Sequence, residues 1–171
     1  MKTLLLPLLC FFSMTIFSQN TENLELLFNW NDETILGTTA YDNAYNEIWG
    51  LVVNNREFAV IGSTAGTHIF DVTDPHNSLE VQFIQGASFG PSIIHRDYHD
   101  RNGYLYAVSD EGNSSLQIID IKNLPEIATV VYDSNELIKT SHNIFIDENS
   151  NVMYACNCLL YTSPSPRDSD S

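Results

Sequence analysis

A recurring triplet limits what this chain of 171 residues can fold into. An aromatic residue, an alanine and a small apolar residue recur as Phe58-Ala59-Val60, Tyr106-Ala107-Val108 and Tyr154-Ala155-Cys156, with successive alanines 48 residues apart. Each triplet follows a turn rich in Asn, and Asn and Gly supply the positive φ that a tight reversal of the chain needs. A fixed period of this length indicates a repeat protein, and about 48 residues is typical of β-propeller blades.

Each repeat contains short apolar segments separated by turn signals. These segments are 48–53, 58–60, 67–72 and 80–84 in the first repeat, 96–98, 106–108, 116–121 and 127–132 in the second, and 143–146 and 154–156 in the third. Four short strands make one propeller blade. The sequence therefore predicts an all-β chain in which residues 46–157 form about two and a third blades of an incomplete propeller ring, after a lead-in at 19–45. A β-sandwich also has short strands, but nothing makes them recur at a fixed spacing.

Residues 1–18 are predicted to be a secretory signal peptide. Lys2 precedes an apolar block from Leu4 to Phe17, and the polar residues Ser18-Gln19-Asn20 follow. The block is shorter than the roughly 20 residues of a membrane-spanning helix, and no basic run follows it. We therefore expect a secreted or cell-surface protein with no membrane insertion after cleavage of the signal.

Residues 158–171 are expected to be non-native. The string from Cys158 to Asp168 resembles the translation of an adapter used to prepare DNA-sequencing libraries. A natural linker rich in Pro and Ser is the alternative. A non-native segment has no part in the fold.

The charge of the chain excludes two classes of partner. The 22 acidic residues outnumber the 7 Lys and Arg residues, and the net charge is −15. Nucleic-acid binding and anionic-lipid binding both need a basic surface. The acidic residues are scattered rather than spaced as in a calcium-binding loop, which indicates a solvated surface. Outside the predicted signal peptide and tail, Cys156 is the single cysteine, so we expect neither an internal disulfide nor a cysteine-ligated zinc.

Several motifs together resemble a known family over nearly all of residues 19–157. They are Glu47-Ile48-Trp49-Gly50, Gly62-Ser63-Thr64-Ala65-Gly66-Thr67, Phe70-Asp71-Val72-Thr73-Asp74-Pro75, Arg96-Asp97, Leu116-Gln117-Ile118-Ile119-Asp120 and His142-Asn143-Ile144. This combination is similar to the choice-of-anchor B family of LVIVD-repeat proteins. The resemblance implies a bacterial secreted or cell-surface β-propeller without an established biochemical role. It also implies that a surface anchor, if there is one, follows residue 157. His95 and His99 depart from the family pattern, which usually has Trp and Lys there.

The starts of the first strands are the predicted ligand-binding site. In the 48-residue register, position 142 aligns with positions 46 and 94, just before the first strand of each blade. The first strand of a blade is the innermost, so these positions surround the mouth of the central channel. The candidate residues are Glu47, Arg96, Asp97, His142 and Asn143. The alternative is structural, with Arg96 paired to Asp97 between blades and His142 capping a turn.

No motif predicts a bound metal or cofactor. His95 and His99 are four residues apart and would share one face of a strand, with Asp97 between them. Two imidazoles without a third placed ligand make a poor zinc site. His68 and His76 are expected to be ordinary surface residues.

No motif predicts catalysis either. The chain has no Gly-x-Ser-x-Gly nucleophile elbow. Residues 109–112 only partly match the Asp-box turn of sialidase propellers. Paired carboxylates that meet only in space stay open as an alternative.

Three hypotheses follow. The favoured one is a non-enzymatic module that binds an extracellular protein or glycan. The second is an extracellular hydrolase or lyase with its site at the channel mouth. The third is a metal-stabilised structural module.

Overall fold

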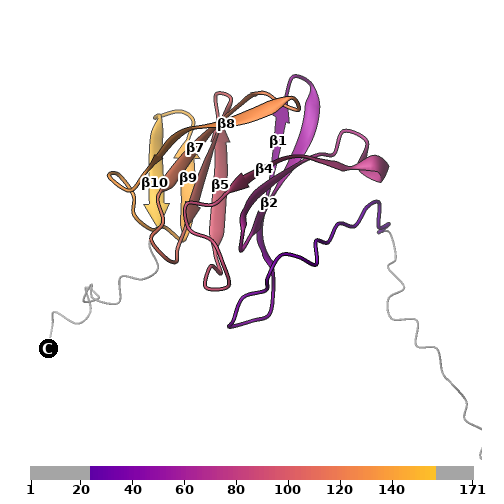
Figure 1. The fold of residues 1–171 in the computed structure, drawn as a ribbon. Helices are drawn as coiled ribbons and strands as arrows, with labels where there is room; N and C mark the ends of the chain where they lie inside the picture. The colour runs from indigo at the N-terminus through magenta and orange to yellow at the C-terminus, as the bar shows by residue number, and fades with distance from the viewer. Residues whose placement is uncertain (1–23, 157–171) are drawn as a thin grey trace, which may run out of the picture.

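The computed structural model describes residues 24–156, which fold into ten β-strands (Figure 1). The strands are β1 (Tyr45–Val53), β2 (Arg56–Ser63), β3 (Gly66–Asp71), β4 (Leu79–Gln85), β5 (Arg96–Arg101), β6 (Tyr104–Ser109), β7 (Leu116–Asn123), β8 (Ile127–Ser134), β9 (Asn143–Asp147) and β10 (Val152–Cys156). One 3₁₀ turn, η1 (Pro75–Asn77), precedes β4. No helix in this part of the chain is long and apolar enough to cross a membrane. The predicted signal peptide and the predicted non-native tail lie outside the described residues.

The strands form three antiparallel sheets, each made of consecutive strands. The sheets are β1-β2-β3-β4, β5-β6-β7-β8 and β9-β10, and they follow one another from right to left in Figure 1. The repeated triplets lie in β2, β6 and β10, so the 48-residue period corresponds to one sheet. The all-β prediction is confirmed. Residues 24–156 do not close into a ring of sheets.

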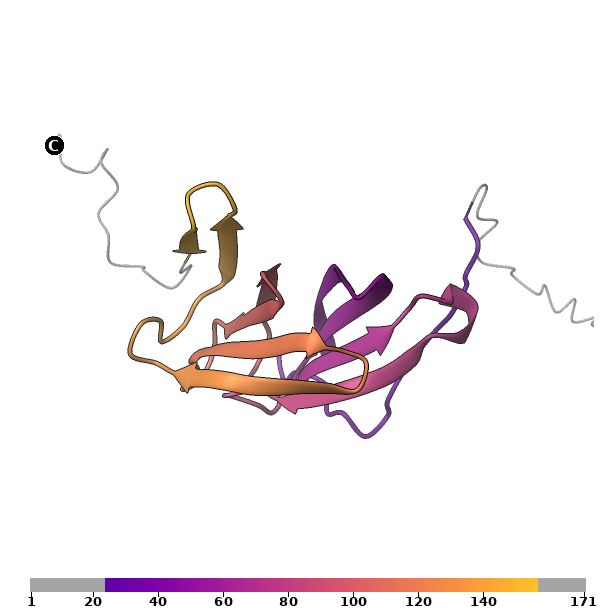
Figure 2. The same ribbon diagram turned by 90° about the horizontal axis from the view of Figure 1, so that it is seen from above.

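Consecutive sheets stack face to face in the same orientation. The first strand of the second sheet, β5, contacts both β1 and β9, which are the first strands of the neighbouring sheets. The last strands β4 and β8 also contact each other (Figure 2). The first strands of the three sheets therefore lie beside one another, as do the last strands of the first two sheets.

The turn chemistry explains the hairpin register. Asn102 and Gly103 have φ of 52° and 77°, and Asn54 and Asn55 have 51° and 60°, as predicted for two-residue hairpin turns. The third hairpin reverses over residues 148–151 instead, which lengthens it by two residues.

Because of this longer turn, the residues before it in the third repeat are shifted by two positions relative to the 48-residue register. Ala59 pairs with Gly50 and Ala107 with Tyr98, each nine residues earlier, whereas Ala155 pairs with Ile144, eleven residues earlier. His142 therefore occupies the position of Arg96 in its sheet rather than that of position 94.

The main hydrophobic core lies between the first and second sheets. Val60, Ile69, Leu105 and Ile119 are fully buried there, together with Tyr98. The Tyr98 hydroxyl lies 3.0 Å from Thr67 Oγ1, and burial raises the pKa of Tyr98 to about 12. A smaller core around Val108, Leu116 and Ile144 joins the second and third sheets.

The lead-in segment crosses the opposite face of the first sheet. Trp30 anchors it, with its ring centroid 4.8 Å from that of Phe70, 5.0 Å from that of His68 and 5.3 Å from that of Tyr45. Much of this face is uncovered, because Ile48 and other apolar side chains on it are exposed.

Candidate functional site

Four polar side chains meet where β5 and β9 begin, and we call them the entrance cluster: His95, Asp110, Glu111 and His142. His142 Nδ1 lies 2.9 Å from Asp110 Oδ2, and His95 Nδ1 lies 2.6 Å from Glu111 Oε1. The two imidazole centroids are 4.5 Å apart. The second and third sheets thus contribute to one constellation of acids and imidazoles.

Hairpin register places two members of the entrance cluster opposite each other. The two-residue turn at 102–103 pairs Arg96 with Ser109, so His95 and Asp110 come next along the two strands. The Asp110 amide donates to the His95 carbonyl at 3.3 Å, which extends the ladder by one step. His142 arrives from the third sheet, where its amide donates to the Cys156 carbonyl at 2.8 Å.

The two carboxylates of the entrance cluster differ in their hydrogen bonding. Glu111 is satisfied, since its Oε2 accepts from the amides of Ile94 and His95 at 3.0 and 2.9 Å. Asp110 is only 4% exposed, and its Oδ1 is the one buried side-chain nitrogen or oxygen in residues 24–156 without a hydrogen-bond partner. A buried carboxylate oxygen without a partner carries an uncompensated desolvation cost.

Arg96, one of the predicted binding residues, links the first two sheets. It is 6% exposed, its Nε donates to the Ser63 carbonyl at 2.7 Å, and its Nη2 donates to the Ser88 carbonyl at 2.6 Å. A Cβ at Gly86 would collide with the guanidinium, so the absence of a side chain there makes room for Arg96. Burial lowers the pKa of the Arg96 guanidinium.

Asp97 has the corresponding role toward the third sheet. It is 8% exposed, and its Oδ2 accepts from the Ile144 amide at 2.5 Å. The predicted pairing of Arg96 with Asp97 is absent from the ion pairs of the described residues. Each side chain binds the backbone of a different neighbouring sheet instead.

The other predicted residues are divided between the cluster and its surroundings. His142 belongs to the entrance cluster. Glu47 lies in β1, where its Oε1 accepts from the amide of Ile48 at 3.0 Å. Asn143 is exposed at the start of β9, and its carbonyl accepts from Ser141 Oγ at 2.9 Å. The structure therefore does not gather the five predicted residues into one site.

The structure separates the two histidines considered together in the sequence. His95 precedes β5 and joins the entrance cluster. His99 lies within β5, is 8% exposed, and packs its ring 4.8 Å from Trp49 and 5.3 Å from Phe145. The spacing of four residues does not form a site, because it separates two positions along a strand by about 13 Å.

No protein-family model matches the sequence, and no curated protein or solved structure is significantly similar to it.

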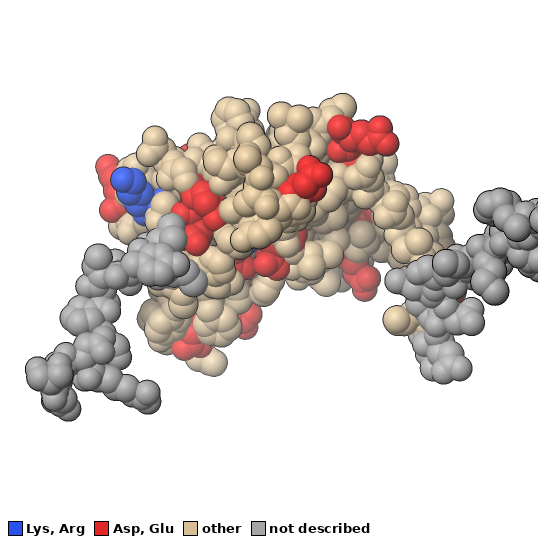
Figure 3. Space-filling view, turned by 90° about the horizontal axis from the view of Figure 1, so that it is seen from below, with Lys and Arg blue, Asp and Glu red and all other residues tan. Residues whose placement is uncertain are grey.

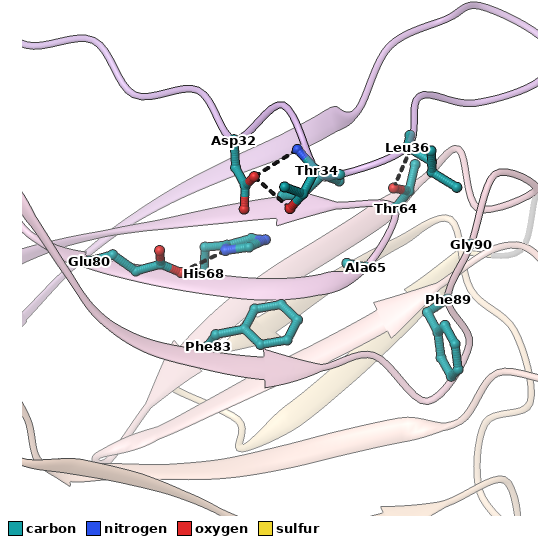
Figure 4. A pocket seen from close by; sticks show the side chains of 11 residues that line it. Asp32, Thr34, Leu36, Thr64, Ala65, His68, Glu80, Phe83, Phe89 and Gly90 are labelled. Atoms are coloured by element: carbon teal, nitrogen blue, oxygen red, sulfur yellow. Dashed lines mark hydrogen bonds and ion pairs between the residues drawn. The ribbon is translucent and has the colours of Figure 1, made fainter.

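A pocket of about 470 Å³ lies between the lead-in and the uncovered face of the first sheet (Figure 4). It is lined by Asp32, Thr34, Ile35, Leu36, Thr64, Ala65, His68, Glu80, Phe83, Phe89 and Gly90. The Thr64 hydroxyl donates to the Leu36 carbonyl at 2.7 Å, which fastens the lead-in over this end of the sheet. The volume lies within the usual range for small-ligand sites.

The pocket combines oriented polar groups with aromatic rings. His68 Nδ1 lies 2.7 Å from Glu80 Oε1, and its Nε2 lies 2.8 Å from Ser63 Oγ. Hydrogen bonds from the Thr34 hydroxyl and amide lower the pKa of Asp32.

His68 is not the surface residue that the sequence predicts. It is only 4% exposed, so that expectation is wrong. It lies in β3, every residue of which is buried under the lead-in or against the second sheet.

The surface is acidic over a broad area rather than at one point. On the face in Figure 3, acidic side chains are scattered and basic atoms appear in one place. This distribution agrees with a solvated acidic surface.

Sequence reasoning missed Asp110 and Glu111, which lie beside His95. The two-residue turn at 102–103 could have revealed the pairing, because that turn fixes which residues of the hairpin face each other. No comparable signal exists for His142, which reaches the cluster only through the stacking of two sheets.

Proposed function

We propose that this chain is a secreted or cell-surface β-propeller repeat module that binds an extracellular glycan without catalysis. The observation that carries the proposal is the pocket under the lead-in, with carboxylates at Asp32 and Glu80 beside the exposed rings of Phe83 and Phe89. Carboxylates accept hydrogen bonds from sugar hydroxyls, and aromatic faces pack against the apolar faces of sugar rings.

The stacking of the sheets supports the propeller part of the proposal. First strands lie beside first strands and last strands beside last strands. Apolar side chains remain exposed on the outer faces at both ends of the stack: Ile48 and Val52 on the first sheet, Tyr154 on the third. Further sheets of the same kind would cover such faces in a ring.

The size and lining of the pocket favour a glycan over a protein partner. A protein interface generally covers a broad surface of about 800 Å² per partner. A pocket of about 470 Å³ suits a small ligand of one or two rings. The negative charge of the lining favours a neutral or cationic sugar over an acidic one.

One hydrogen-bonded chain favours hydrolysis as a second candidate. Ser63 Oγ, the His68 imidazole and the Glu80 carboxylate are connected at 2.8 and 2.7 Å, in the order of a Ser-His-acid triad. Ser63 is fully buried, however, and its Oγ accepts from the amides of Ala65 and Gly66, both at 3.1 Å. A hydroxyl held in its own turn and closed to solvent cannot reach a substrate, so binding is the better explanation of the site.

Glycan-array screening of the purified protein, followed by calorimetric titration of the strongest hit, tests the proposal. Phe83→Ala and Phe89→Ala are the test variants, since both rings are exposed, at 49% and 60%, and their loss should leave the fold intact. Each should weaken binding by about tenfold, as expected when an aromatic contact is lost.

Phe145→Ala is the matched control. Phe145 is equally exposed, at 58%, but lies on the third sheet. Affinity unchanged by Phe145→Ala supports the pocket, and equal losses in all three variants would place binding elsewhere. Labelling of Ser63 by an active-site phosphonate probe would favour hydrolysis instead.

A further inference from the structure

We propose that the entrance cluster is a binding site for a divalent transition-metal ion such as Zn²⁺, with His95, Asp110 and His142 as ligands. One potential ligand atom from each of these residues lies within 4.8 Å of those of the other two. The inference is independent of the glycan pocket, which uses none of these residues.

The hydrogen bonds of the cluster define which atoms would bind the ion. A carboxylate oxygen only accepts, so Nδ1 of His95 donates to Glu111 and Nδ1 of His142 donates to Asp110. His95 then presents an unprotonated Nε2, the usual ligand atom, whereas an ion bound to Asp110 would replace the proton on His142 Nδ1, the ring nitrogen 2.9 Å from that carboxylate. The third donor is Asp110 Oδ1, which is buried and has no partner.

The desolvated Asp110 is the strongest indication of a ligand. Its side chain is 5% exposed, and a hydrogen bond satisfies only its Oδ2. Buried charges in proteins are normally paired or coordinate metals. A cation beside Oδ1 would supply the missing partner, and two imidazoles with one carboxylate are a common ligand set for Zn²⁺.

Glu111 completes the arrangement as a positioning residue. It holds the His95 ring through Nδ1 at 2.6 Å and is itself fixed by the amides of Ile94 and His95. A carboxylate behind a ligating histidine fixes its tautomer and raises its basicity.

The geometry requires a small contraction on binding. Ligand atoms around a tetrahedral Zn²⁺ are about 3.3 Å apart, given bonds of about 2.0 to 2.1 Å. His142 Nδ1 is already 2.9 Å from Asp110 Oδ2, and the side chain of His95 is 43% exposed, so it has room to move toward Asp110. Water would take the fourth position.

Calorimetric titration of the chelator-treated protein with Zn²⁺ tests the proposal, with Co²⁺ as a spectroscopic probe of coordination. We expect one Zn²⁺ per chain and the intense visible absorption of four-coordinate Co²⁺. His95→Ala and Asp110→Asn should each weaken Zn²⁺ binding by at least tenfold, and Glu111→Gln should weaken it about 10- to 100-fold.

His76→Ala is the control, because His76 is exposed in η1 and takes no part in the cluster. Unchanged affinity in this variant, with circular dichroism showing that all variants fold alike, supports the proposal. It is overturned if the wild-type chain binds no Zn²⁺, or if His95→Ala binds Zn²⁺ as tightly as wild type. A loss in His76→Ala equal to that in His95→Ala would also overturn it.

Discussion

The two faces of the first sheet have similar apolar side chains and opposite environments. Toward the second sheet, Val60 and Ile69 are fully buried against Tyr98. On the other face, the apolar side chains of Ile48 and Phe83 are 67% and 49% exposed, apart from the strip that Trp30 and the lead-in cover. A sheet that is apolar on both sides is built to lie between two others. The covered face therefore supplies the stability of the first sheet, and the open face is a surface that can accept a further layer or a ligand.

The largest expected effect separates two isoleucines of this sheet. Ile69→Ala removes a fully buried side chain from the covered face and should lower the free energy of unfolding by about 3 to 4 kcal/mol. Ile48→Ala, on the open face, should change it by less than about 0.5 kcal/mol. Urea unfolding followed by tryptophan fluorescence measures both. Equal effects would mean that the open face is covered in solution.

Arg96→Ala should have the next largest effect. It leaves the buried carbonyl of Ser63 and the partly buried carbonyl of Ser88 without their donor, so we expect a loss of about 3 kcal/mol in the free energy of unfolding. Arg56→Ala is the control, since the Arg56 side chain is 48% exposed in its ion pair with Asp71 and should contribute under about 1 kcal/mol. Similar losses in the two variants would show that Arg96 does not link the sheets.

Alkaline pH should weaken the covered face specifically. The pKa of Tyr98 is raised to about 12 by burial, against about 10 in the unfolded chain. Between these values the unfolded state releases a proton that the native state keeps, so stability falls as pH rises. Tyr98 therefore contributes about 2 to 3 kcal/mol to the free energy of unfolding below pH 10, relative to its contribution above pH 12. Denaturant unfolding at pH 9 to 12 measures it, and Tyr98→Phe should flatten the decline. An equally steep decline in Tyr98→Phe would exclude Tyr98 as its cause.

The smallest expected effect concerns the third sheet. Asp97→Ala removes the acceptor of the Ile144 amide and should reduce local stability by about 1 to 2 kcal/mol. Hydrogen exchange should accelerate about 10-fold across β9 and β10 and stay unchanged in β2 and β3. Acceleration throughout the chain would mean that the sheets unfold as one unit.

Much of the fold could be predicted from the sequence because each sheet is made of local hairpins. The triplet at 58–60 and its copies fall on the second strand of every sheet, and Asn102-Gly103 forms the expected turn. The register of the third repeat could not be read from the period alone. Its turn is longer, and this displaces His142 by two residues relative to the inner strand.

The candidate sites were harder to predict because they depend on contacts between sheets. Arg96 and Asp97 were expected to bind a ligand, but each bonds to the backbone of a different neighbouring sheet. Asp110 and His142 meet only when the second and third sheets stack. His68 is buried because Trp30 of the lead-in folds over it, and no local pattern indicates that contact.

The central claim is that consecutive repeats stack face to face, so that the second sheet packs directly on the first. The contact that represents it is the Tyr98 hydroxyl 3.0 Å from Thr67 Oγ1, between β5 and β3 of the neighbouring sheet. A nuclear Overhauser measurement on the purified protein tests it directly. The stacking predicts strong cross-peaks from the Tyr98 ring to the Thr67 methyl group. Cross-peaks from that ring confined to its own sheet would contradict the stacking.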